Sequence, residues 1–196
     1  MSSMPTASQN EIDLSEQLKT KIIQFIHSNQ GWISFDRFME FVLYDPELGY
    51  YTGTLRKFGE KGDFVTASEI SNFFAKTLCI QFKEIFKSIS RNIIEIGAGS
   101  GQFALQVLQS LSSDNENINH YLILEISPSL KKQQYELLIN HLPSYLFSKI
   151  QWIDDIPKEY EGIIFCNELL DALPVDLIKK VSGKYYQKGI GVENDL

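Results

Sequence analysis

Apolar side chains recur at helical spacing through the first quarter of the chain and predict two helices there. The first closes at Asn29-Gln30-Gly31, where glycine suits the left-handed conformation that ends many helices. The second has Ser34 as a candidate N-cap and ends at Asp45-Pro46, because the residue before proline avoids helical angles. The apolar positions that define them are Leu14, Leu18, Ile22, Phe25 and Ile26, then Phe35, Phe38, Met39, Val42 and Leu43.

The next two segments differ in character. Residues 49–63 are rich in glycine and carry the pair Tyr50-Tyr51, so they predict an irregular loop. Thr66 and Glu69 then have the spacing of a capping box. Apolar positions continue at helical spacing as far as Phe86, and they predict one long helix that starts at this cap.

After residue 91 short apolar runs alternate with helical patterns, which is typical of βαβ units and a parallel sheet. The last two runs are joined by Ser182-Gly183 and predict a hairpin. We therefore expect an α/β protein with three regions: a disordered leader over 1–13, a helical region over 14–90 and a sheet core over 91–196. The predicted strands are Asn92 to Ile96, Tyr121 to Ile126, Lys149 to Ile153, Gly162 to Cys166, Val175 to Val181 and Lys184 to Val192, with helices at Gln102 to Leu111 and Ser129 to Asn140.

Composition narrows the classes of function. The net charge is -7 and no lysine–arginine cluster is present, which argues against a nucleic-acid partner. No apolar run approaches the ~20 residues that span a bilayer, and the first residues do not resemble a secretion signal. Cys79 and Cys166 lie far apart in apolar surroundings, which favours a reducing compartment, so we expect a cytoplasmic protein. The three histidines lack ligand spacing, and we expect no metal site.

The most informative segment is the turn between the first predicted strand and its helix. Gly97, Gly99 and Gly101 remove side chains that would keep a ligand away from the backbone. A dinucleotide fingerprint would place its third glycine where Gln102 stands, so that interpretation is weakened, although not excluded. Glu95, an acid at the strand end, fits the zwitterionic methionine and ribose of S-adenosylmethionine better. A tight turn without a ligand is the structural alternative.

Acidic residues also follow the next two strands. Glu125 ends the second strand, where a carboxylate can accept hydrogen bonds from both hydroxyls of a ribose. Asp154, after the third strand, is a candidate for the adenine amino group, with Trp152 or Ile153 over the ring. Adjacent acids before a proline also mark ordinary loops, and this alternative stays open for Asp154.

Asn167 to Asp171 follows the fourth strand, and polar groups at the carboxyl ends of parallel strands face the crevice where ligands bind. Asn167 is a candidate cofactor contact, and Glu168 and Asp171 are candidate substrate contacts. The alternative is that Asn167 caps a helix and both acids interact with its dipole. The two interpretations are compatible.

Several motifs together resemble the MidA family of class I S-adenosylmethionine-dependent methyltransferases. They are residues 43–51 (LYDPELGYY), 62–71 (GDFVTASEIS), 95–101 (EIGAGSG), 125–128 (EISP) with Leu130 and Gln134, and 167–174 (NELLDALP). The sequence departs from the family at Ser100, where a basic residue is common, at Gln106, where an acid is common, and at Ala75, where glycine is usual. Leu169-Leu170 stands where the family usually has two aromatics.

The resemblance implies a Rossmann-like class I methyltransferase sheet, here incomplete because family members continue well past residue 196. It implies a protein-arginine methyltransferase related to the mitochondrial complex I assembly factor, with a complex I subunit as its partner and the mitochondrial matrix as an alternative compartment. It also implies that Gly62, Asp63 and Phe64 form a lid over the cofactor. Glu168 and Asp171 would then orient a guanidinium and accept its proton. A non-catalytic S-adenosylmethionine-binding or assembly protein is the alternative function.

Overall fold

The computed structural model describes residues 7–52, 67–114 and 116–193. The chain divides into two units, one made of residues 1–54 and 170–196 and the other of residues 55–169. Each has a hydrophobic core of its own among the described residues. Within these described ranges, none of the helices is long and apolar enough to cross a membrane.

The first unit combines N-terminal helices with the C-terminal hairpin. Its three-stranded antiparallel sheet has the order β1-β7-β6 and pairs Ile33 with Ile190. Ile22, Ile26 and Ile33 form its core, and Ile190 packs against them. Its elements are α1 (Gln9–Ser28), β1 (Trp32–Ser34), α2 (Phe35–Tyr44), the 3-10 helix η1 (Leu170–Ala172), β6 (Leu177–Val181) and β7 (Lys184–Gly191).

Two expectations about this unit were wrong. The first helix starts at Gln9 rather than after residue 13, because Ser8 and Glu11 form a capping box in which each side chain bonds the other's backbone N–H. The hairpin does not join the parallel strands of the 91–196 region. Instead β7 pairs with β1, a strand that the apolar pattern did not predict, since it is only three residues long.

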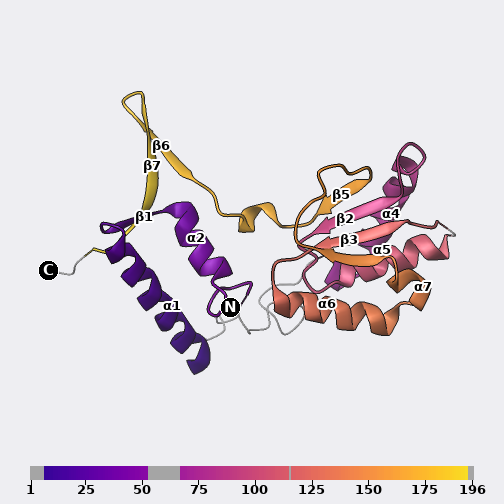
Figure 1. The fold of residues 1–196 in the computed structure, drawn as a ribbon, viewed down its shortest axis with the longest axis horizontal. Coiled ribbons are helices and arrows are strands. Elements are labelled where there is room, and N and C mark those ends of the chain that lie inside the picture. Colours follow the sequence, from indigo (N-terminus) through magenta and orange to yellow (C-terminus); the bar gives the residue numbers. More distant parts are fainter. Residues whose placement is uncertain (1–6, 53–66, 115, 194–196) are drawn as a thin grey trace, which may run out of the picture. The chain divides into compact units, whose positions relative to one another are not determined.

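The second unit contains a four-stranded parallel sheet with the order β4-β3-β2-β5 (Figure 1). Ile93, Tyr121 and Ile123 are fully buried within its core. This order and the helical crossovers confirm the Rossmann-like α/β expectation. The elements are α3 (Ala67–Ile70), α4 (Phe73–Ile85), β2 (Asn92–Ile96), α5 (Gln102–Ser113), β3 (His120–Leu124), α6 (Pro128–His141), α7 (Ser144–Phe147), β4 (Ile150–Ile153) and β5 (Ile163–Cys166).

The long helix expected from residue 66 to Phe86 is interrupted. It consists of α3 and α4, separated at Ser71-Asn72. The Ser71 hydroxyl accepts a hydrogen bond of 3.3 Å from the Phe73 N–H, and such local side-chain bonds compete with helical backbone bonds. Strand β3 ends at Leu124, so that Glu125 and Ile126 lie just beyond the strand, at the carboxyl end of the parallel sheet.

Candidate cofactor site

The turn between β2 and α5 has a backbone that requires glycine. Gly97, Gly99 and Gly101 have φ values of 69°, 55° and 84°, in the left-handed region that L side chains rarely adopt. A Cβ on Gly97 would lie 2.9 Å from Leu169 Cδ1, and one on Gly101 would lie 3.2 Å from Gln134 Cγ. The three glycines therefore allow both the bend of the chain and the close packing of its neighbours.

Helix α3 is fastened to this turn. Ser100 Oγ donates a hydrogen bond to Glu69 Oε1 and accepts one of 3.3 Å from the Gln102 N–H. One turn further along α5, Gln106 Nε2 donates to the Ser68 carbonyl at 2.8 Å. Ser100 and Gln106 are two of the positions where the sequence departs from the pattern of the family it resembles, and here both connect α3 to the start of α5.

Glu95 lies inside the protein, close to the end of β2. Its side chain is 3% exposed, and the Tyr121 hydroxyl on β3 donates a hydrogen bond of 2.7 Å to Oε2. Burial raises the pKa of the Glu95 carboxyl to about 7, although the Tyr121 hydrogen bond lowers it; the negative charge of Glu125 adds to the increase. Glu95, two residues before the first glycine of the turn, therefore titrates near neutral pH.

Glu125 is also buried, at 6% exposure, but it is held by different donors. Oε1 accepts a 3.0 Å hydrogen bond from the Ser127 N–H, and Oε2 accepts one of 3.1 Å from Gln134 Nε2. Burial raises the pKa of Glu125 against the opposing effect of these hydrogen bonds. A carboxylate has about four lone-pair sites, so these donors leave Glu125 further acceptor capacity.

Gln134 on α6 connects three parts of the site. Besides Glu125, its Nε2 donates to the Gly99 carbonyl at 2.9 Å, and its Oε1 accepts from Trp152 Nε1 at 2.9 Å. The side chain is completely buried, and all its hydrogen-bonding groups have partners. The single side-chain amide of Gln134 thereby connects the carboxyl ends of β2, β3 and β4.

The residues after β4 and β5 are more exposed. The Asp154 side chain is 87% exposed and pairs with Lys131 Nζ at 2.8 Å, which lowers the pKa of Asp154. Asn167 is half-buried, while Glu168 is exposed with a φ of 50°. A left-handed glutamate is uncommon, and such backbone conformations often occur at functional sites.

The structure brings some predicted residues together and separates others. The three glycines, Glu95 and Glu125 lie around the ends of β2 and β3, and Asp154 pairs with Lys131 of α6, the helix that also carries Gln134. Glu168 belongs to the second unit, whereas Asp171 lies in η1 of the first. Gly62, Asp63 and Phe64 lie outside the described residues.

The sequence did not predict the hydrogen bonds made by Tyr121, Ser127 and Gln134, although Tyr121 lies in a predicted strand and the other two in a family motif. Tyr121 occupies an apolar strand, where a buried phenol signals that a polar partner is nearby. Ser127 accepts from the Leu130 N–H at 3.5 Å and caps α6, which a serine before proline could have indicated. In the part of the chain that the structure describes, no group of three or more His, Cys, Asp and Glu side chains could hold a metal ion.

A parallel sheet with a glycine turn after its central strand and a buried acid after the next strand is typical of Rossmann-like cofactor-binding proteins. Residues 77–195 match the family model described as "Putative S-adenosyl-L-methionine-dependent methyltransferase". The chain belongs to this family, which confirms the resemblance drawn from its motifs.

Individual relatives agree with this assignment. The mitochondrial protein arginine methyltransferase NDUFAF7 homolog of Drosophila melanogaster is 29% identical over 91% of this chain and 45% of its own length. Human NDUFAF7 is 32% identical over 76% of this chain and 40% of its own length. A Burkholderia thailandensis protein crystallised with S-adenosyl-homocysteine has a TM-score of 0.88 and 35% identity, over 98% of this chain and 51% of its own. The chain thus spans about half the length of these proteins.

Proposed function

We propose that the chain binds S-adenosylmethionine at the carboxyl ends of β2 and β3, and that the whole protein transfers its methyl group to an arginine of a protein substrate. The observation that carries the proposal is the pair of hydrogen bonds from Gln134 to Glu125 and to the Gly99 carbonyl. One buried amide holds the candidate ribose acceptor and the glycine turn together. Bound S-adenosyl-homocysteine in the Burkholderia relative supports the same choice of cofactor.

The residues present fit this cofactor. The glycines keep Cβ atoms away from the turn, so that the backbone can approach the methionine part of the ligand. Glu125 retains acceptor capacity for the ribose hydroxyls. Asp154 would accept from the adenine amino group, and Asn167 would add a contact from the end of β5. Glu95 is assigned a supporting role below the turn, because its carboxylate faces Tyr121.

S-adenosylmethionine, when bound, supplies a methyl group on a positively charged sulfur. The protein's contribution is to orient the acceptor and to exclude water. Glu168 and Asp171 are proposed, each on its own, as the catalytic carboxylate that would bind a guanidinium and accept the proton that it loses. Because they belong to different units, each is to be tested as a separate variant. Gly62, Asp63 and Phe64 are proposed as a lid on the basis of the family resemblance.

The names of the Drosophila and human relatives support arginine in a protein as the acceptor. The resemblance of the chain to the complex I assembly factor adds a complex I subunit as the proposed partner. Transfer of labelled methyl groups to arginine in such a subunit is the expected activity of the whole protein. Cofactor binding without transfer would favour a non-catalytic S-adenosylmethionine-binding or assembly function.

The cofactor site is tested by calorimetric titration with S-adenosylmethionine. Glu125→Gln keeps the size of the side chain but removes its negative charge, and we expect binding to weaken about tenfold or more, since hydrogen bonds to a charged group contribute roughly 1.5–3 kcal/mol. Glu136→Gln is the matched control, because Glu136 is an exposed acid on α6. No binding by the folded wild-type chain, or equal binding by Glu125→Gln, would contradict the proposed site.

A further inference from the structure

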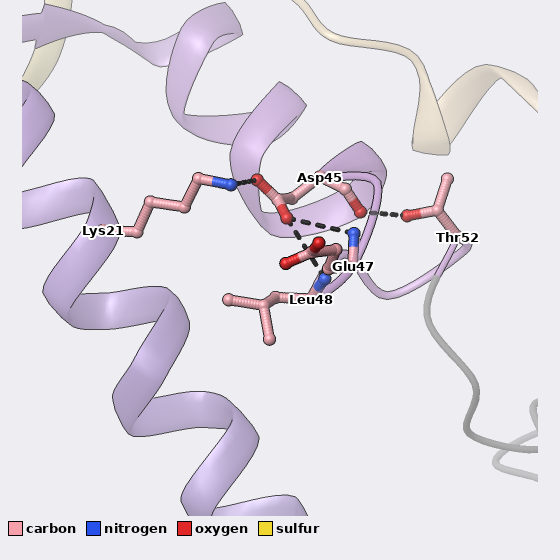
Figure 2. Close-up of polar contacts among 5 residues, drawn as sticks. All are labelled: Lys21, Asp45, Glu47, Leu48 and Thr52. Carbon is pink, nitrogen blue, oxygen red and sulfur yellow. Dashed lines mark hydrogen bonds and ion pairs between the residues drawn. The ribbon is translucent and has the colours of Figure 1, made fainter.

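A buried carboxylate organises the turn that follows α2, residues 45–52. Asp45 is only 5% exposed, and its side chain accepts hydrogen bonds from Lys21 Nζ at 2.5 Å, the Leu48 N–H at 3.1 Å and the Glu47 N–H at 3.2 Å (Figure 2). Thr52 Oγ1 donates to the Asp45 carbonyl. Burying a charge is costly unless it is paired and hydrogen-bonded, so these bonds fix the turn in one conformation.

This turn places two tyrosines beside the end of α2. The N–H groups of Tyr50 and Tyr51 donate to the carbonyls of Val42 and Leu43, each at 2.8 Å. Gly49 is required between them and Asp45, because a Cβ there would clash with the Asp45 backbone, whose carbonyl oxygen would lie only 2.7 Å away. The backbone at Tyr50 and Tyr51 is therefore anchored on both sides.

The tyrosine rings form a small aromatic wall. The Tyr44 and Tyr51 rings are stacked, with centroids 5.6 Å apart and an interplanar angle of 25°. Tyr50 meets Tyr51 edge-on at 5.0 Å and 84°. All three side chains are half-buried rather than enclosed in the core. Faces of aromatic rings carry negative electrostatic potential, which attracts cations.

The carboxylate of Asp171, in η1, lies close to this aromatic wall. The Tyr44 hydroxyl donates a 2.8 Å hydrogen bond to the Ala172 carbonyl and so holds η1 against α2. Asp171, exposed on η1, is close enough to contribute to the raised pKa of the Tyr51 phenol, behind the larger effect of burial. Asp45 and Asp154 each pair with a lysine, whereas Asp171 forms no ion pair with any described residue.

We propose that Tyr51 and Asp171, supported by Tyr44 and Tyr50, bind the guanidinium of the acceptor arginine. This proposal rests on the proposed function and names a substrate subsite for it within the first unit alone. A guanidinium is planar, so it can stack on a tyrosine face while two of its N–H groups bond a carboxylate. An ammonium is a compact, strongly hydrated charge that lacks this flat, forked geometry. The subsite is thus expected to prefer arginine to lysine.

The subsite is tested by NMR titration of the full chain, following the tyrosine ring signals. The probes are Nα-acetyl-arginine methylamide and Nα-acetyl-citrulline methylamide, which has a similar shape without the charge. We expect only the arginine probe to shift the Tyr51 signals. Exposed cation–π contacts and exposed ion pairs each contribute modestly, so Asp171→Asn and Tyr51→Leu should each weaken arginine binding roughly two- to fivefold.

Two further variants test whether the loss of arginine binding is specific to the aromatic face and to the Asp171 carboxylate. Tyr51→Phe keeps the aromatic face and should keep the affinity for the arginine probe. Glu47→Gln removes an exposed negative charge from the same turn and should also leave it unchanged. Equal shifts with citrulline, or equal weakening by Glu47→Gln and Asp171→Asn, would overturn the subsite. Titration of the same variants with S-adenosylmethionine shows separately whether the cofactor proposal fails.

Discussion

Two buried glutamates, Glu95 in β2 and Glu125 just after β3, show how little the residue type alone says about its environment. Glu95 accepts a hydrogen bond from a phenol, that of Tyr121, while Glu125 accepts hydrogen bonds from a backbone N–H and a side-chain amide. Burial raises the pKa of both. Glu95 releases its proton near pH 7, so its charge and its contribution to stability change within the neutral range.

Glu95 should make the second unit less stable as the pH rises. Its folded pKa, about 7, lies above the ordinary value of 4.5, so the folded state binds more protons than the unfolded state between these values. The stabilisation is complete below pH 4.5 and is lost as the pH rises through 7. Glu95→Gln removes this dependence while keeping an acceptor for Tyr121. The difference in unfolding free energy, variant minus wild type, should increase by roughly 2–3 kcal/mol from pH 5 to pH 8.

Urea unfolding at both pH values measures this difference. In a Trp32→Phe background, fluorescence reports on Trp152, which lies in β4 of the second unit. The same background serves for both proteins, so the effect of Trp32 cancels. Parallel changes of stability with pH in wild type and Glu95→Gln would show that Glu95 titrates as an ordinary glutamate.

The sequence predicted β2, the glycine turn and α5, including both ends of β2 and the first residue of α5. The apolar run predicted Asn92 to Ile96, which is β2, and the glycines predicted the turn. What remained hidden was the packing around it. Gln134 comes from α6, 33 positions after Gly101, and contacts the turn only because the crossover returns α6 to this edge of the sheet.

Gly101→Ala should weaken cofactor binding much more than Gly183→Ala. Both glycines have nearly the same left-handed φ, 84° and 82°, so both variants carry a similar backbone cost, of order 1 kcal/mol or more. A Cβ on Gly101 would also press on Gln134 at 3.2 Å, whereas nothing lies within 4 Å of one on Gly183. Calorimetry with S-adenosylmethionine should show roughly tenfold weaker binding for Gly101→Ala and less than a twofold change for Gly183→Ala. Similar losses in both would argue that Gln134 does not support the site.

At the scale of the whole molecule, the described residues form two separate hydrophobic cores. A ligand that binds only the folded second unit stabilises it by RT ln(1 + [L]/Kd), about 2.7 kcal/mol at a hundredfold excess over Kd. With S-adenosyl-homocysteine at that concentration, hydrogen exchange should slow in β2, β3 and α6. The amides of α1 and β7 should change little, and equal protection of both units would contradict a site confined to the second.

Local sequence patterns determined the strands β2 to β5, the glycine turn and the acid near the end of β3, because each follows from the preferences of a few adjacent residues. The resemblance of its motifs determined the family. Only the tertiary structure decided that β7 pairs with β1 and that Gln134 joins the turn to Glu125. Strand partners and buried hydrogen bonds depend on residues far apart in the chain, and side-chain periodicity carries no record of which distant residue completes them.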